Sequence, residues 1–143
     1  MGLAKMIIAA DTSALMAVIL NEPERQSFIR VLTAASAVYI SAPTLLETLM
    51  VAYGRRGNRA RALVRHVMDI SSFQVVPADA AMAELAYDAF EIYGKGSGHP
   101  AQLNFGDTFS YALAKIKNVP LLFKGNNFSR TDVRACEGSS VYP

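Results

Sequence analysis

Short apolar runs alternate along the chain with longer stretches in which apolar residues recur every three or four positions. These are the patterns of buried strands and amphipathic helices. Strands are predicted at 6–9, 37–41, 73–76 and 120–123. Helices are predicted at 15–19, 24–35, 44–53, 59–70, 78–93 and 106–117, with loops at 54–58, 94–104 and 124–132. The connections are long enough for parallel crossovers, so we expect one domain, 1–143, folded as a three-layer α/β/α sandwich with a short parallel sheet.

Three acidic residues interrupt this pattern because each stands alone among uncharged residues. Asp11 follows the first predicted strand, Glu47 lies on the helix after the second, and Asp107 opens the helix before the fourth. No basic residue lies within a helical turn of any of them. An unpaired carboxylate in apolar surroundings is costly, so each acid needs a donor, a cation or one of the others nearby.

Convergence of these acids would create a site for a hard cation. The carboxyl ends of parallel strands share one edge of a sheet, where ligands of open α/β folds bind. Two carboxylates about 4 Å apart repel by about 4 kcal/mol at an effective dielectric of 20. Ligation by oxygen alone favours Mg²⁺ or Mn²⁺, ions that polarise phosphoryl groups and activate bound water. A covalent nucleophile is not indicated, because the chain has no G-x-S-x-G and Cys136 has no histidine near it in sequence.

Charge, cysteine content and hydrophobicity indicate the compartment and the partners of the protein. The net charge of the 143 residues is only +2, but five arginines between Arg55 and Arg65 occur without an acid among them. The single cysteine, Cys136, excludes an intrachain disulfide and fits a reducing compartment. Asp11 interrupts the first apolar run too early for a signal peptide, and no run suits a membrane span, so a cytoplasmic location is expected. The hydrophobic fraction of 52% suggests that a partner covers some apolar surface.

These residues resemble a known family. Asp11-Thr-Ser-Ala-Leu, the isolated Glu47, Gly106-Asp107 and the run PLLFKGNNFSRTD look like the PIN-domain ribonucleases, in particular the VapC toxins of bacterial toxin–antitoxin pairs. The resemblance covers nearly the whole chain. It implies a Mg²⁺- or Mn²⁺-dependent endoribonuclease that forms a homodimer and is inhibited by a cognate antitoxin. Asp11 and Asp107 then match the metal-binding acids, Glu47 the second acid of the cluster, and Ser13 a polar position beside them.

The match departs from the family pattern at one place. An acid usually precedes the phenylalanine of the KGxxF run, whereas Asn127 stands here. Asp132 matches the aspartate of the TD pair and could assist a second metal or orient water. It could equally pair with its neighbours Arg130 and Arg134. The departure puts tight binding of two metals in doubt more than cleavage itself.

Basic residues outside the acid cluster suit a polyanionic partner. The candidate residues for contact with RNA or with an acidic antitoxin segment are Arg55, Arg56, Arg59, Lys124 and Arg130. Contacts of such residues with phosphate give affinity that is independent of sequence. The sequence leaves both partners open.

Individual residues argue for or against three other functions. A phosphatase of the haloacid dehalogenase type needs a second aspartate two positions after the first, where Ser13 stands. A response-regulator receiver needs an acidic pair near the first strand, which is absent. An inactive PIN scaffold that binds a partner is favoured by Asn127 and opposed by Asp11, Glu47 and Asp107.

Overall fold

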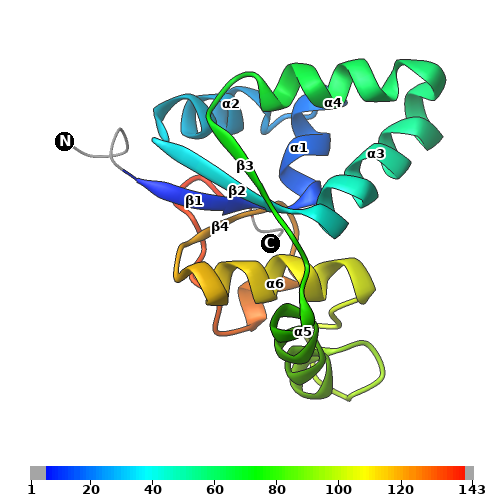
Figure 1. Cartoon of the computed structure of the whole chain (residues 1–143), viewed down its shortest axis with the longest axis vertical. Helices are drawn as coiled ribbons and strands as arrows, with labels where there is room; N and C mark the ends of the chain where they lie inside the picture. Colours follow the sequence, from blue (N-terminus) through cyan, green and yellow to red (C-terminus); the bar gives the residue numbers. More distant parts are fainter. Residues whose placement is uncertain (1–5, 141–143) are drawn as a thin grey trace.

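A computed structural model describes residues 6–140 (Figure 1). The elements in chain order are β1 (Ile7–Ala10), α1 (Thr12–Ile19), α2 (Arg25–Ala34), β2 (Ala37–Ser41), α3 (Ala42–Arg56), the 3₁₀ turn η2 (Gly57–Arg59), α4 (Ala60–Met68), β3 (Phe73–Val76), α5 (Ala80–Tyr93), α6 (Phe105–Lys117), β4 (Leu121–Leu122) and the 3₁₀ turn η3 (Phe128–Arg130). The predicted α/β/α architecture is confirmed, and the second and third strands have the predicted bounds.

The four strands form a parallel sheet in the order β3-β2-β1-β4. The chain runs from β1 outward to β3 and then crosses to place β4 on the other side of β1. This reversal of direction beside β1 is the kind of switch point at which parallel sheets bind ligands. Asp11 lies directly after β1, and its backbone N–H donates to the Leu122 carbonyl of β4 (3.0 Å).

Two hydrophobic cores cover the two faces of the sheet. Ile8 and Ala10 of β1 pack with α1 and α2, whereas Ala9 packs with α5 and α6 on the opposite face. Alternate residues of a strand point to opposite faces, so the continuous apolar run at β1 is explained by burial on both sides. Figure 1 shows the two helical layers with the sheet between them. α3 contacts α1, α4 and α6 at the carboxyl end of the sheet.

Helix boundaries differ from the sequence prediction where side chains cap the backbone. The N-cap of α1 is Asp11, because its carboxylate accepts the Ser13 N–H (3.0 Å). Ser41 caps α3 by accepting the Thr44 N–H (3.1 Å), so this helix starts earlier than predicted. The predicted turn at 54–58 is wrong, since α3 continues through Gly54 to Arg56. The chain turns only at Gly57, whose φ of +61° favours glycine.

The remaining connections are short or held by backbone bonds. The predicted loop at 94–104 is tied at its ends by a bridge between Gly94 and Leu103. The segment after β4 contains η3 and isolated bridges from Leu121 to Ala135 and from Lys124 to Ser140. Within 6–140, none of the helices is long and apolar enough to cross a membrane.

Candidate active site

Asp11 is the buried centre of the site. Its side chain is held between two elements because Oδ2 accepts the Ser13 N–H (3.0 Å) and the Ser13 hydroxyl (2.7 Å) of α1. Oδ1 accepts the hydroxyl of Ser110 from α6. Both carboxylate oxygens are therefore oriented, and only 5% of the residue is exposed.

Glu47 is attached to the same turn by a threonine. The Thr12 hydroxyl donates to Glu47 Oε1 (2.8 Å) and lies 3.0 Å from the Thr48 hydroxyl. The carboxylate of Glu47 rests against the backbone of Gly106, where a Cβ would overlap Oε2. Glycine at 106 thus leaves room for Glu47 beside the first turn of α6.

Asp107 lies in that first turn and belongs to a capping box. Asn104 accepts the Asp107 N–H (2.9 Å), and Asp107 Oδ2 accepts the Asn104 N–H (3.0 Å). The same Oδ2 accepts the side-chain amide of Asn127 (2.9 Å). The helix N-terminus and both asparagines therefore fix the position of this carboxylate.

The three acids interact electrostatically, as expected if they face one space. Burial, followed by the charge of Asp11, raises the pKa of Asp107 to about 6, and Glu47 adds to the rise. Burial and the charge of Asp11 also raise the pKa of Glu47, although the Thr12 hydrogen bond opposes the change. The charge of Asp11 thus disfavours ionisation of both Glu47 and Asp107. The convergence predicted for Asp11, Glu47 and Asp107 is consistent with these interactions and with the contact at Gly106.

The donor set suits a hard divalent cation. The side chains that hydrogen-bond to the three acids all offer oxygen, apart from the amide nitrogen of Asn127, and within 6–140 none of these partners is a thiol or an imidazole. Among residues 6–140, no group of three or more His, Cys, Asp and Glu side chains could hold an ion in the conformations described. Mg²⁺ typically takes one or two carboxylates and completes its shell with water and substrate phosphate. Asp11 and Asp107 fit that requirement, with Glu47 close to them.

A buried hydroxyl network supports the acids and was missed in the sequence. Ser110 links Asp11 to Thr44, whose hydroxyl lies 3.5 Å away and accepts from Ser41 (2.8 Å). Thr48 donates to the Thr44 carbonyl (2.8 Å). These hydroxyls all come from positions with helical or strand patterns, so their polarity was the only signal. Their burial shows that the site extends through α3 and α6.

Comparison with known proteins decides the family. The family model described as PIN domain matches residues 8–134, which is most of the chain. The chain belongs to the PIN-domain family. Ribonuclease VapC42 of Mycobacterium tuberculosis is 41% identical over 127 residues, 88% of this PIN protein and 97% of the relative. Ribonuclease VapC28 of the same species is 38% identical over 124 residues, with 87% and 93% covered. Within the family the chain therefore falls among the VapC ribonucleases.

Solved structures share the fold. The Mycobacterium tuberculosis toxin VapC20, described as cleaving the sarcin-ricin loop, has a TM-score of 0.74 at 20% identity over 90% of this chain and 98% of its own. VapBC-1 from Haemophilus influenzae has a TM-score of 0.65 at 18% identity, with 93% and 98% covered. At these identities the similarity concerns the PIN fold alone.

Asp132 lies apart from the acid cluster of this PIN domain. It accepts the Tyr111 hydroxyl and forms an ion pair with Lys115 (3.0 Å), and these bonds lower its pKa although burial opposes them. Its side chain is 55% exposed. No hydrogen bond described within 6–140 joins it to Asp11, Glu47 or Asp107. The partner suggested by sequence, Arg130 or Arg134, is replaced by Lys115 because α6 brings that lysine alongside.

Lys124 also differs from its predicted role. Its ammonium group forms ion pairs with Glu22 (3.0 Å) and Glu24 (3.0 Å), and its side chain is only 14% exposed. Burial works against its charge, but the bonds to Glu24 and Glu22 outweigh burial and raise the pKa of Lys124. A lysine committed in this way is poorly placed to bind an RNA phosphate. The contact with RNA or antitoxin expected at Lys124 stays a prediction, and the structure gives this lysine an internal role beside it.

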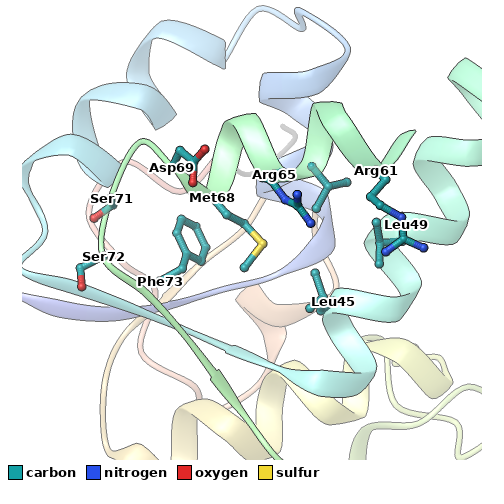
Figure 2. Close-up of a pocket in the computed structure, with 10 residues that line it drawn as sticks. Leu45, Leu49, Arg61, Arg65, Met68, Asp69, Ser71, Ser72 and Phe73 are labelled. Atoms are coloured by element: carbon teal, nitrogen blue, oxygen red, sulfur yellow. The ribbon is translucent and has the colours of Figure 1, made fainter. Parts of the chain in front are cut away.

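The predicted arginines are exposed, and two more arginines line a groove. Arg55, Arg56 and Arg59 lie at the exposed end of α3 and in η2, and Arg130 donates to the Pro100 carbonyl (3.3 Å). A groove of about 500 Å³ runs between α3 and α4 and is called here the arginine groove. Its lining is Leu45, Leu49, Arg61, Val64, Arg65, Met68, Asp69, Ser71, Ser72 and Phe73. Figure 2 shows Arg61 and Arg65 extending from α4 toward α3.

The arginine groove lies on a different side of α3 from Glu47. Leu45 and Leu49 line the groove, while Glu47 lines a second hollow with Phe105 and Gly106. Residues two positions apart on a helix point about 200° apart, which explains the separation. The groove is therefore not part of the acid site.

Proposed function

We propose that this PIN-domain protein is a Mg²⁺- or Mn²⁺-dependent endoribonuclease that hydrolyses phosphodiester bonds in RNA. The observation that carries the proposal is that Glu47 lies against Gly106, next to Asp107, and that the charge of Asp11 raises the pKa of both Glu47 and Asp107. Three carboxylates whose charges oppose one another favour a cation, and PIN-domain relatives named as ribonucleases supply the substrate class. Cys136 and the RNA substrate suit a cytoplasmic location.

Two of the acids then bind the ion, and the third acts as a base. Asp11 and Asp107 hold the ion, with Ser13, Ser110 and Asn127 fixing their orientation. The ion, when bound, neutralises charge on the phosphate and makes a water molecule more acidic. Glu47 accepts the proton of the attacking water as a general base, and its raised pKa makes it a stronger proton acceptor. Water adds to phosphorus as the bond from phosphorus to the leaving ribose oxygen breaks, and this oxygen takes up a proton from solvent to become a hydroxyl.

The arginine groove is the proposed docking site for an antitoxin. Its floor is apolar, with Leu45, Leu49 and Phe73, and its rim carries Arg61 and Arg65. An amphipathic segment with apolar and acidic side chains would bury against the floor and pair with the arginines. Solved structures of similar fold include a toxin–antitoxin complex from Klebsiella pneumoniae (TM-score 0.62, 19% identity). RNA is a poorer occupant because the groove faces away from Glu47.

A homodimer is proposed through the apolar surface on the other side of α3. Phe105 is 79% exposed and lies between two hollows, one lined by Leu46 and Met50 and the other by Tyr87 and Phe90. Glu47 is the one charged residue that lines either hollow, within the described part of the chain. An apolar surface with so little charge suits a second copy of the same surface better than RNA.

The test of cleavage is the sequencing of RNA ends after brief expression of the wild type and of Asp11→Asn. New ends at defined sites with the wild type alone are expected. The alternative, a scaffold without activity, is favoured only by Asn127 in place of an acid. That alternative would produce the same RNA ends in both cultures, with no heat of Mn²⁺ binding to the purified wild type.

A further inference from the structure

Lys124 joins two distant parts of the chain to the acid site. Its ammonium group reaches Glu22 and Glu24 in the connection between α1 and α2, about a hundred residues earlier in sequence. Its own backbone N–H donates to the Ser13 hydroxyl (3.0 Å). That hydroxyl in turn donates to Asp11 Oδ2 (2.7 Å). Two hydrogen bonds therefore separate Asp11 from a lysine that does not touch it.

The segment that begins at Lys124 also contacts Asp107. Gly125, with a φ of +113°, turns the chain so that Asn127 donates to Asp107 Oδ2 (2.9 Å). Lys124 thus hydrogen-bonds to Ser13, which is a partner of Asp11, and Asn127 hydrogen-bonds to Asp107 directly. We call this stretch the 124–127 bridge.

The outer side of the bridge is held by the same acidic residues. Ser140 accepts the Gly125 N–H through its carbonyl (2.8 Å), and its hydroxyl donates to Glu24 Oε2 (3.2 Å). Glu24 therefore contacts both Lys124 and Ser140, and these two residues pair with each other in an isolated β-bridge. Its pKa is lowered, chiefly by the hydrogen bond from Lys124 against the effect of burial, so the carboxylate is charged at neutral pH.

We propose that Glu22, Glu24 and Lys124 are positioning residues that press the 124–127 bridge against the acid site and so preset Asp11 and Asp107 for the metal ion. The inference rests on the proposed metal-dependent function. Two carboxylates that must share an ion repel each other without it, and fixed donors hold them at a workable separation. Outer partners of metal ligands commonly contribute 10–100-fold to metal affinity.

A second ion pair in the same molecule provides the contrast. Lys115 pairs with Asp132 (3.0 Å) on the exposed side of α6, and neither residue is hydrogen-bonded to the acid site in the described structure. If the ion pairs acted only through general stability, the loss of metal affinity in each variant would follow its loss of unfolding free energy. Positioning by the bridge predicts that only the loss of Lys124 matters.

The experiment is calorimetric titration of the purified full chain with Mn²⁺, together with urea unfolding. Lys124→Gln is expected to weaken Mn²⁺ binding by about 10-fold or more, and Lys115→Gln by less than twofold. Lys124→Arg, which keeps the charge, should recover part of the loss. Folded Lys124→Gln with wild-type affinity for Mn²⁺ would overturn the proposal.

Two further variants cover the case in which Lys124→Gln does not fold. Glu22→Gln removes one ion pair from a side chain that is 34% exposed, and it should still weaken Mn²⁺ binding measurably. Ser13→Ala cuts the link to Asp11, so its effect and that of Glu22→Gln should combine to less than their sum. Unchanged affinity in Glu22→Gln, or full additivity, would contradict positioning through Ser13.

RNA binding separates this role from a direct contact. In EDTA, Lys124→Gln should bind a single-stranded RNA with the same salt dependence as the wild type, whereas loss of a phosphate contact would lower the slope by about one. A lower slope with intact Mn²⁺ affinity would show that Lys124 contacts RNA instead. If the wild type itself binds no Mn²⁺, the proposed function fails and this inference falls with it, whereas a wild type that binds Mn²⁺ as tightly as Lys124→Gln overturns the inference alone.

Discussion

Asn127 donates its side-chain amide to Asp107 Oδ2 at 2.9 Å, in the position where the family pattern leads one to expect another acid. A carboxylate at this position would face Asp107 with no proton to share. The amide instead stabilises the charged form of Asp107 and opposes the rise in its pKa caused by burial and by Asp11. The residue that departs from the pattern is thus a working part of the acid site.

Asn127→Asp should therefore act in opposite directions with and without metal. Without metal, the loss of a donor and the added charge should lower the free energy of unfolding by about 1–3 kcal/mol. With Mg²⁺, the extra carboxylate should tighten binding and lower the concentration needed for half-maximal cleavage. Urea unfolding in EDTA and a cleavage assay across a Mg²⁺ titration measure the two effects. A variant that needs more Mg²⁺ than the wild type would contradict this account.

Asp107→Asn should abolish most of the thermal stabilisation by Mn²⁺. An ion that binds only the folded state raises the melting temperature, and Asp107 is one of its two proposed ligands. Asp132→Asn is the matched control, because Asp132 is bound to Tyr111 and Lys115 outside the site. The control should keep both the Mn²⁺ effect and cleavage within about twofold. Equal loss of the Mn²⁺ effect in both variants would indicate nonspecific ion binding.

Metal-free stability should rise as the pH falls from 7.5 to about 5. The pKa of Asp107 is raised to about 6 from a usual value of 3.8, and that of Glu47 is also raised. The folded protein then binds more protons than the unfolded chain in this window, so stability falls as pH rises through it. Below about pH 4 the trend should reverse, because the pKa values of Asp132 and Glu24 are lowered.

Urea unfolding in EDTA at several pH values measures this dependence. Asp107→Asn should flatten it between pH 7.5 and 5, which isolates the contribution of Asp107. A wild type that gains stability steadily from pH 5 to 7.5 would show that Asp107 and Glu47 are not mutually destabilised.

Reversal of charge in the arginine groove should weaken antitoxin binding without affecting cleavage. Arg61→Glu with Arg65→Glu is expected to lower affinity for an antitoxin encoded beside this gene by about 10–100-fold, since both rim charges turn repulsive. Cleavage by the antitoxin-free protein should stay within about twofold. Arg30→Glu on exposed α2 is the control. If cleavage falls and antitoxin affinity does not, the groove binds RNA.

Phe105→Ser should convert a homodimer to a monomer. The variant removes a side chain that is 79% exposed and changes no charge, so the fold should survive. Ile116→Ser, at another exposed apolar position of α6, is the control and should leave association unchanged. Sedimentation velocity distinguishes the two states. A wild type that is already monomeric at micromolar concentration would refute the dimer.

The sequence predicted the architecture and the acids for a physical reason. Asp11, Glu47 and Asp107 were conspicuous because charge among apolar residues is costly, and periodicity placed each at the same end of the sheet. Local pattern could not show which distant groups satisfy a charge. Lys124 meets Glu22 across 102 positions, and Asp132 meets Lys115 rather than its neighbours in sequence. Ser110 was hidden because a small hydroxyl fits an apolar helix face.

Gly106 shows a different limit of sequence patterns. In the sequence it belongs to the Gly106-Asp107 motif of the family resemblance, but nothing there shows that its lack of a Cβ makes space for Glu47. The reason lies on α3, some sixty residues earlier. Only the packing of α3 against α6 reveals it.

The strand order has a consequence for folding during synthesis on the ribosome. The acid site needs β1 at the start of the chain, but β4 and the 124–127 bridge complete it from the far end. A ribosome making this protein has therefore released almost every other element before Asp11 and Asp107 acquire their final partners. The message being translated therefore meets an incomplete acid site until residues 124–127 have emerged and bound Ser13 and Asp107.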